Sequence, residues 1–162
     1  MLRTEYGIRY PLNFDVYPRG EFDDCDLVIN SWNIDIKSTR SGNWLLFEHN
    51  KLVMRSRQTI DTMPDAIFMC RTPWVKGKDE PTGKVELIGA ISLEKLLSNS
   101  KQIKRLPKGS YIPNTHAKLQ ANNYAVHFDD LSHNWNQIIN YMKKHPPCGC
   151  YRVPIWTNYA KP

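Results

Sequence analysis

The chain has 162 residues, of which 41% are hydrophobic and 23% are charged. This length and balance suit one folded domain with its own core, and they exclude a disordered chain. The formal net charge of +6 favours a polyanionic partner through long-range attraction. No apolar run approaches the roughly 20 residues of a transmembrane helix, and the first residues contain no apolar signal-peptide segment. We therefore expect a cytoplasmic protein with no membrane partner.

The first 20 residues are aromatic and interrupted by prolines, and they lead into the most informative stretch of the chain. Asp26 opens an apolar run that breaks at the turn formers 30–33. The run 34–37 then alternates apolar and polar residues, as a strand with two different faces does. A hairpin turning within 30–33 returns Asp26 beside Asp35 and Lys37, which share one strand face. The sequence therefore predicts two carboxylates and one ammonium group near a common point.

That arrangement has a chemical use. Asp26, Asp35 and the backbone carbonyl of Ile36 are oxygen ligands of the kind that Mg²⁺ prefers. A metal there would polarise a phosphoryl oxygen and lower the pKa of a bound water. Lys37 would orient or help deprotonate that water, or stabilise charge on the phosphate. An Asp/Glu-x-Lys tripeptide is also expected by chance about once in such a chain, and alternating charges are common on solvated strands. The combination with the acidic opening, the apolar strand and the turn favours the functional interpretation.

These residues resemble the core of the PD-(D/E)XK nuclease superfamily, the restriction-endonuclease-like fold. The resemblance covers about residues 14–97, and its matching pieces are 26–29, 34–39, 65–70 and 85–91. It implies an α/β (α+β) fold with a central mixed β-sheet flanked by helices. It also implies cleavage of phosphodiesters that depends on Mg²⁺, for which Mn²⁺ can substitute. Asp26, Asp35 and Lys37 stand at the positions carried over from the family.

The sequence departs from the family pattern in two places. No proline precedes Asp26, and little room remains for the helix that usually precedes the hairpin. That helix often supplies a further glutamate, a role for which Glu5 and Glu21 are the candidates here. Gln58 is a candidate late polar member of the site, or a solvated glutamine.

Further elements are expected along the whole chain, which we interpret as one nuclease-like domain with a core at 14–97 and a basic, aromatic extension at 98–162. The expected elements are strands at 14–17, 44–47, 66–70, 85–91 and 124–128, a polar hairpin loop at 76–84, a helix at 93–97 capped by Ser92, and a helix with the apolar stripe Trp135, Ile138, Ile139 and Met142. The nearly continuous apolar run at 66–70 predicts a strand buried on both faces, and the stripe predicts core or interface packing. The segment 98–123 is expected to be mainly loop, because prolines and glycines interrupt it. It is also basic, with the cations Lys101, Lys104, Arg105, Lys108 and Lys118.

Basic and polar residues follow the hairpin in three groups. In a nuclease they would contact backbone phosphates, although each group could equally be a solvated surface. The candidates for nucleic-acid binding are Ser38, Thr39, Arg40, Lys51, Arg55, Arg57, Lys104, Arg105 and Lys108.

The four cysteines divide into two pairs. Cys25 and Cys70 lie in or beside expected strands, where a small buried apolar residue is the expected role. Cys148 and Cys150 could bind zinc together with His145 or His133, or they could belong to a plain turn.

The leading functional hypothesis is a Mg²⁺-dependent endodeoxyribonuclease. Because cutting both strands of a duplex requires two active sites, a homodimer bound to DNA is the expected assembly. The alternative is a non-catalytic nucleic-acid-binding or assembly module on a nuclease-like scaffold. A third interpretation is a small interaction partner that docks through its aromatic tail and the helix carrying Trp135. The chain has no Gly-rich phosphate loop and no Gly-x-Ser-x-Gly elbow, which disfavours nucleotide-hydrolysing and acyl-transfer chemistry.

Overall fold

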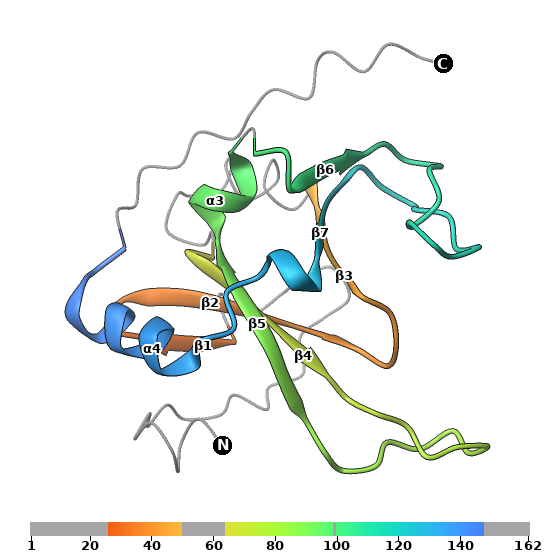
Figure 1. Ribbon diagram of the computed structural model, residues 1–162, viewed down its shortest axis with the longest axis horizontal. Helices are drawn as coiled ribbons and strands as arrows, with labels where there is room; N and C mark the ends of the chain where they lie inside the picture. Colours follow the sequence, from red (N-terminus) through yellow and green to blue (C-terminus); the bar gives the residue numbers. More distant parts are fainter. Residues whose placement is uncertain (1–25, 50–63, 99, 148–162) are drawn as a thin grey trace, which may run out of the picture.

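The computed structural model describes residues 26–49, 64–98 and 100–147, which form a mixed α+β fold with two β-sheets (Figure 1). The first sheet has the order β1-β2-β4-β5, and the second has the order β3-β7-β6. The strands are β1 (Leu27–Ile29), β2 (Trp32–Thr39), β3 (Trp44–Glu48), β4 (Ala66–Arg71), β5 (Glu86–Ser92), β6 (Ile103–Leu106) and β7 (Asn123–His127). The helices are α3 (Leu93–Leu97), the 3₁₀ helix η2 (Phe128–Asp130) and α4 (Trp135–Lys144).

The first sheet is mixed, as the sequence predicts. Strands β1 and β2 form an antiparallel hairpin, β2 runs parallel to β4, and β4 runs antiparallel to β5. The first five of the six residues of β4 are buried, which agrees with the prediction of a strand covered on both faces.

The hairpin turn is tighter than expected. Asn30 and Ser31, with φ of 45° and 68°, form a two-residue turn of the kind that matches the twist of paired strands. Trp32, expected in the turn, instead opens β2 and pairs with Ile29. Its indole Nε1 donates a hydrogen bond to the backbone oxygen of His145 at 2.7 Å, and its ring is buried. Packing against the end of α4 therefore holds Trp32 in the strand.

The second sheet is antiparallel, and the sequence did not predict it as a separate sheet. The expected strands at 44–47 and 124–128 pair with each other and with β6, which lies within the segment expected to be loop. Strand β6 forms because Ile103 is buried and pairs with Val126, although cations occupy the next two positions. The structure also ends β7 at His127, and Phe128 begins the turn of η2.

Two hydrophobic clusters lie on opposite faces of the first sheet. Ile67 and Met69 of β4 belong to the cluster shared with the second sheet, together with Phe47. Phe68 of β4 belongs to the cluster beneath α4, which includes Ile139 of the predicted apolar stripe. Met142 of the stripe is also buried there, and Trp135 and Ile138 pack against the cluster, so the prediction of core or interface packing is confirmed as packing on the core.

The two α-helices begin with side-chain caps. The Ser92 side chain accepts a hydrogen bond from the backbone N–H of Lys95 at 3.2 Å, so the predicted cap of α3 is confirmed. Asn134 caps α4 by accepting from the backbone N–H of Gln137 at 3.1 Å. Helix α4 therefore begins at Trp135, four residues after Leu131, and residues 128–130 form η2 before it.

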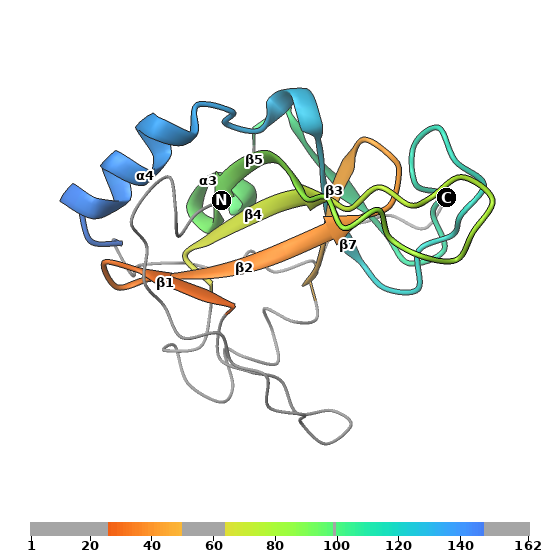
Figure 2. The ribbon, with the colours of Figure 1, turned by 90° about the horizontal axis from the view of Figure 1, so that it is seen from below.

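Three loops project from the same end of the molecule, opposite α4 (Figures 1 and 2). They are the β2–β3, β4–β5 and β6–β7 connections. The first two leave the same edge of the sheet because β2 and β4 are parallel. No helix among residues 26–49, 64–98 and 100–147 is long and apolar enough to cross a membrane.

Candidate active site

The hairpin brings Asp26 back to the middle of β2, as predicted. The backbone N–H of Asp26 donates to the carbonyl oxygen of Ile34 at 3.1 Å, and its Oδ2 accepts a hydrogen bond from the backbone N–H of Ile36 at 2.5 Å. The Asp26 side chain is therefore held against the peptide unit that joins Asp35 to Ile36.

Asp35 and Lys37 form an ion pair on one face of β2. Lys37 Nζ donates a hydrogen bond to Asp35 Oδ1 at 2.7 Å and lies 2.5 Å from Oδ2. The side chains are only 18% and 27% exposed, so solvent screens this pair less than a surface pair. Because Asp35 and Lys37 pair with Ile67 and Met69 of β4, they lie on the face turned toward the second sheet. Lys37 Nζ accordingly lies 5.9 Å from the centre of the Phe47 ring.

The carboxylate oxygens of Asp26 and Asp35 are the candidate metal ligands of this hairpin. Asp35 Oδ2 is buried and receives no hydrogen bond of acceptable geometry from the described residues. A buried carboxylate oxygen suits a cation ligand, because hard cations take oxygen ligands, and here the Lys37 ammonium group already lies 2.5 Å from it. No group of three His, Cys, Asp or Glu side chains gathers for a metal anywhere in the described part of the chain. A cation at this hairpin would thus have two described carboxylates, Asp26 and Asp35, and would need a carbonyl and water for its remaining ligands.

A cavity of about 340 Å³ adjoins Lys37. Its polar lining consists of Lys37 from β2, Glu48 from β3, Asn123 from β7, and Lys118 and Gln120 from the β6–β7 loop. These last four residues were not among the predicted site residues. Lys118 was recognised only as one cation of a basic segment, because nothing in the local pattern indicates that the loop returns to β2.

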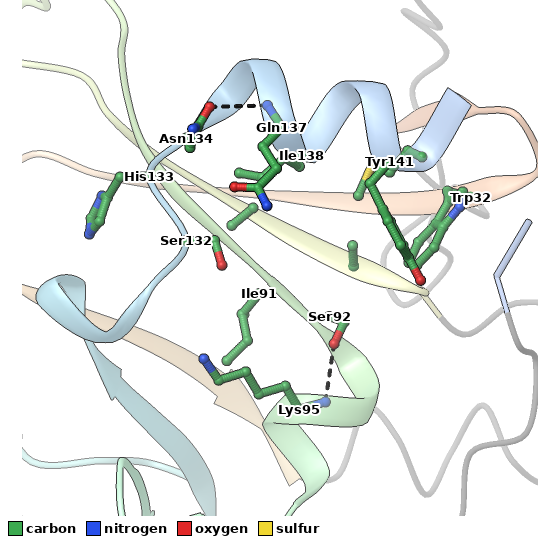
Figure 3. A pocket seen from close by; sticks show the side chains of 13 residues that line it. Trp32, Ile91, Ser92, Lys95, Ser132, His133, Asn134, Gln137, Ile138 and Tyr141 are labelled. Carbon is green, nitrogen blue, oxygen red and sulfur yellow. Dashed lines mark hydrogen bonds between the residues drawn. The ribbon is translucent and has the colours of Figure 1, made fainter. Parts of the chain in front are cut away.

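A second cavity, of about 440 Å³, lies between α4 and the start of α3 (Figure 3). Trp32 and Tyr141 stand at one end of it, and Lys95 reaches in from α3. Of the predicted site residues only His133, a candidate zinc ligand, lines this cavity, and Ala66 and Ala90 of its lining belong to the cluster beneath α4. It is therefore separate from the Asp35–Lys37 pair.

The predicted nucleic-acid-binding residues that the structure describes fall in two places. Ser38, Thr39 and Arg40 follow Lys37 at the end of β2, and the Arg40 guanidinium stacks on Trp74 with Cζ 3.3 Å from the ring centre. Lys104, Arg105 and Lys108 lie on β6 and just beyond it, and Lys104 Nζ lies 4.7 Å from the Trp44 ring centre. The two groups belong to different sheets.

Several predicted residues lie outside the described part of the chain. They are Glu5, Glu21, Cys25, Lys51, Arg55, Arg57, Gln58, Cys148 and Cys150. The expected strand at 14–17 also lies outside the described part. Cys70 is buried in β4 as predicted, and burial raises the pKa of its thiol, which favours an inert thiol.

No protein-family model, no curated protein and no solved structure matches the chain.

Proposed function

We propose that this chain is a metal-dependent nuclease that hydrolyses DNA phosphodiester bonds, built on a restriction-endonuclease-like core. The observation that carries the proposal is the hairpin of β1 and β2, where Asp26 binds the Ile36 N–H beside the Asp35–Lys37 ion pair. The mixed order of the first sheet and the resemblance of residues 26–39 to the nuclease superfamily support the same assignment.

Each residue has a distinct role in this proposal. Asp26 and Asp35, with the Ile36 carbonyl, would hold a divalent cation such as Mg²⁺ or Mn²⁺. When bound, such a cation supplies positive charge at a phosphoryl oxygen and lowers the pKa of a coordinated water. Lys37, held by Asp35, donates hydrogen bonds to the reacting phosphate and stabilises the charge that builds on it. The Asp26 contact with the Ile36 N–H restrains the backbone of the residue whose carbonyl is the proposed ligand.

The test is cleavage of supercoiled plasmid in the presence of Mg²⁺ or Mn²⁺. We expect the wild type to nick or linearise the plasmid, and we expect Asp35→Ala and Lys37→Ala each to slow cleavage by about 100-fold or more, the size of effect seen when one stabilising group is removed from an active site. Glu94→Ala and Lys95→Ala on α3 are matched controls, because both side chains are exposed and outside the hairpin. Thermal unfolding of each variant checks that the fold is retained.

The second candidate is a non-catalytic nucleic-acid-binding module on the same scaffold. One observation favours it: Asp35 and Lys37 already neutralise each other. A wild type that shifts plasmid on a gel but never cuts it, with either metal, would establish this candidate in place of the nuclease. A wild type that neither cuts nor binds would contradict both.

If the protein produces linear plasmid in one binding event, we expect light scattering to show a homodimer, because cutting two strands requires two active sites.

A further inference from the structure

The cavity beside Lys37 is open to solvent and is lined by three separate parts of the chain. Strand β2 contributes Lys37, the second sheet contributes Glu48 and Asn123, and the β6–β7 loop contributes Lys118 and Gln120. Two leucines complete the lining. Its volume of about 340 Å³ lies within the range of sites that hold a small ligand or one unit of a larger one.

The loop that carries Lys118 and Gln120 is held in place by its own backbone. Leu119, between these two residues, is buried, and its N–H donates to the Ser110 carbonyl at 2.9 Å. Its carbonyl accepts from the N–H of Gly109 at 2.9 Å. The loop thus continues the β6–β7 ladder as a hairpin arm. An arm anchored in this way presents side chains with little loss of entropy on binding.

The charges of the cavity favour an anion. Lys118 supplies an ammonium group that forms no ion pair among the described residues, and Lys37 supplies a second one that is shared with Asp35. Gln120 supplies an amide that can donate further hydrogen bonds. Glu48 is the one carboxylate in the lining, and among the described residues it forms no ion pair. A ligand that carries a phosphate and sugar-like hydroxyl groups fits the ammonium groups and the carboxylate together. Its phosphate can bind the ammonium groups, while its hydroxyl groups donate hydrogen bonds to Glu48.

We propose that this cavity binds a backbone phosphate of the nucleic acid, next to the phosphate that reacts at Asp35 and Lys37. The assignment rests on the proposed nuclease function, and it adds a subsite that the β6–β7 arm builds. Lys37 belongs to both the ion pair and the cavity lining, so a strand seated in the cavity passes directly over the candidate active site. Lys118 is then a positioning residue.

Equilibrium binding without metal tests this subsite apart from cleavage. The probe is a fluorescein-labelled DNA duplex titrated in EDTA at several salt concentrations, with anisotropy as the readout. We expect Lys118→Ala to raise the Kd about tenfold and to lower the slope of log Kd against log salt by about 1, as loss of one phosphate contact does. Lys118→Arg should restore most of the affinity. Lys95→Ala, a lysine lining the other cavity, should bind like the wild type.

Several results would overturn the proposed phosphate subsite. Equal Kd and salt slope for wild type and Lys118→Ala would overturn the subsite, as would equal losses in Lys118→Ala and Lys95→Ala, or a wild type that binds no duplex. If the wild type binds duplex through Lys118 but never cuts it, the result would support the subsite and contradict the nuclease function. In a second arm, inorganic phosphate alone is titrated against thermal unfolding. A Lys118-dependent rise in Tm at millimolar phosphate would show a site for free anions and overturn the polynucleotide assignment.

Discussion

His49 and Tyr124 form a buried polar contact where β3 ends, with His49 Nδ1 3.3 Å from the Tyr124 hydroxyl. Burial, and secondarily the positive charge of Arg105, lowers the pKa of His49 below its usual value of 6.5. In the unfolded chain the imidazole titrates near that usual value. The folded protein therefore holds His49 neutral at a pH where the unfolded chain already protonates it.

This difference predicts a pH-dependent stability. Between the lowered folded pKa and 6.5 the unfolded state binds more protons, so the free energy of unfolding falls as pH falls below 6.5. We expect His49→Gln, which cannot titrate, to reduce this loss. The measurement is urea unfolding of both proteins at pH 7.5, 6.5 and 5.5. Parallel pH profiles would show that another group causes the acid sensitivity.

The residue-level predictions made from the sequence, in contrast, relied on neighbouring residues alone. The predicted placement of Asp26 beside Asp35 and Lys37 follows from their spacing around a turn, and the turn formers are local. The same reasoning did not find Glu48 or Lys118, because their proximity to Lys37 depends on how the second sheet and its arm pack.

At the scale of elements, the segment after η2 crosses β5 at close range. The N–H groups of Ala90 and Ser132 each donate to the other residue's carbonyl at 2.9 Å. A Cβ placed on Gly89 would lie 2.7 Å from the Cβ of Leu131. Strand β5 therefore needs glycine at this position for close approach of a second backbone, whereas a strand interior otherwise disfavours it.

We predict that Gly89→Ala lowers the free energy of unfolding by about 1–3 kcal/mol, the usual cost of overpacking, and that Gly89→Leu costs more. Gly83 is the matched contrast, because nothing lies within 4 Å of a Cβ placed there, although its φ is +75°. Gly83→Ala and Gly83→Leu should therefore cost similar amounts. Chemical denaturation of the four variants provides the check. Equal costs for alanine and leucine at Gly89 would contradict the close approach.

Strands were easier to predict than their partners. Both Trp44–Glu48 and Ala66–Arg71 are apolar runs that read as strands, yet they belong to different sheets. Periodicity reports which face of a strand is apolar, but it does not report which strand lies beside it. Strand β6 was missed because two of its four residues, Lys104 and Arg105, are charged.

At the scale of the whole molecule, the net charge of +6 acts together with the three loops that project from one end (Figure 2). The β4–β5 loop carries Lys76 and Lys84, which are exposed. Lys143 and Lys144 lie in the last turn of α4 at the other end. If the proposed function is correct, the cations of the loops should bind nucleic acid more directly than those of α4.

We predict that the double variant Lys76→Ala/Lys84→Ala weakens duplex binding and lowers the salt slope by up to about 2. Lys143→Ala/Lys144→Ala removes the same net charge and should change the slope by much less. Anisotropy titrations in EDTA over a range of salt concentrations measure both. Equal slopes for the two double variants would mean that net charge, and not the loop end, attracts the nucleic acid.

The sequence by itself determined the hairpin and the placement of Asp26, Asp35 and Lys37, the Ser92 cap of α3, the apolar stripe of α4, and the doubly buried strand β4. Each of these depends on residues within about ten positions of one another, where backbone geometry and burial pattern leave few alternatives. Only the tertiary structure decided that the strands divide into two sheets, that β6 forms, and that Glu48, Lys118 and Gln120 meet Lys37 in one cavity. Those features depend on packing between segments up to 80 or so residues apart, which local pattern does not encode.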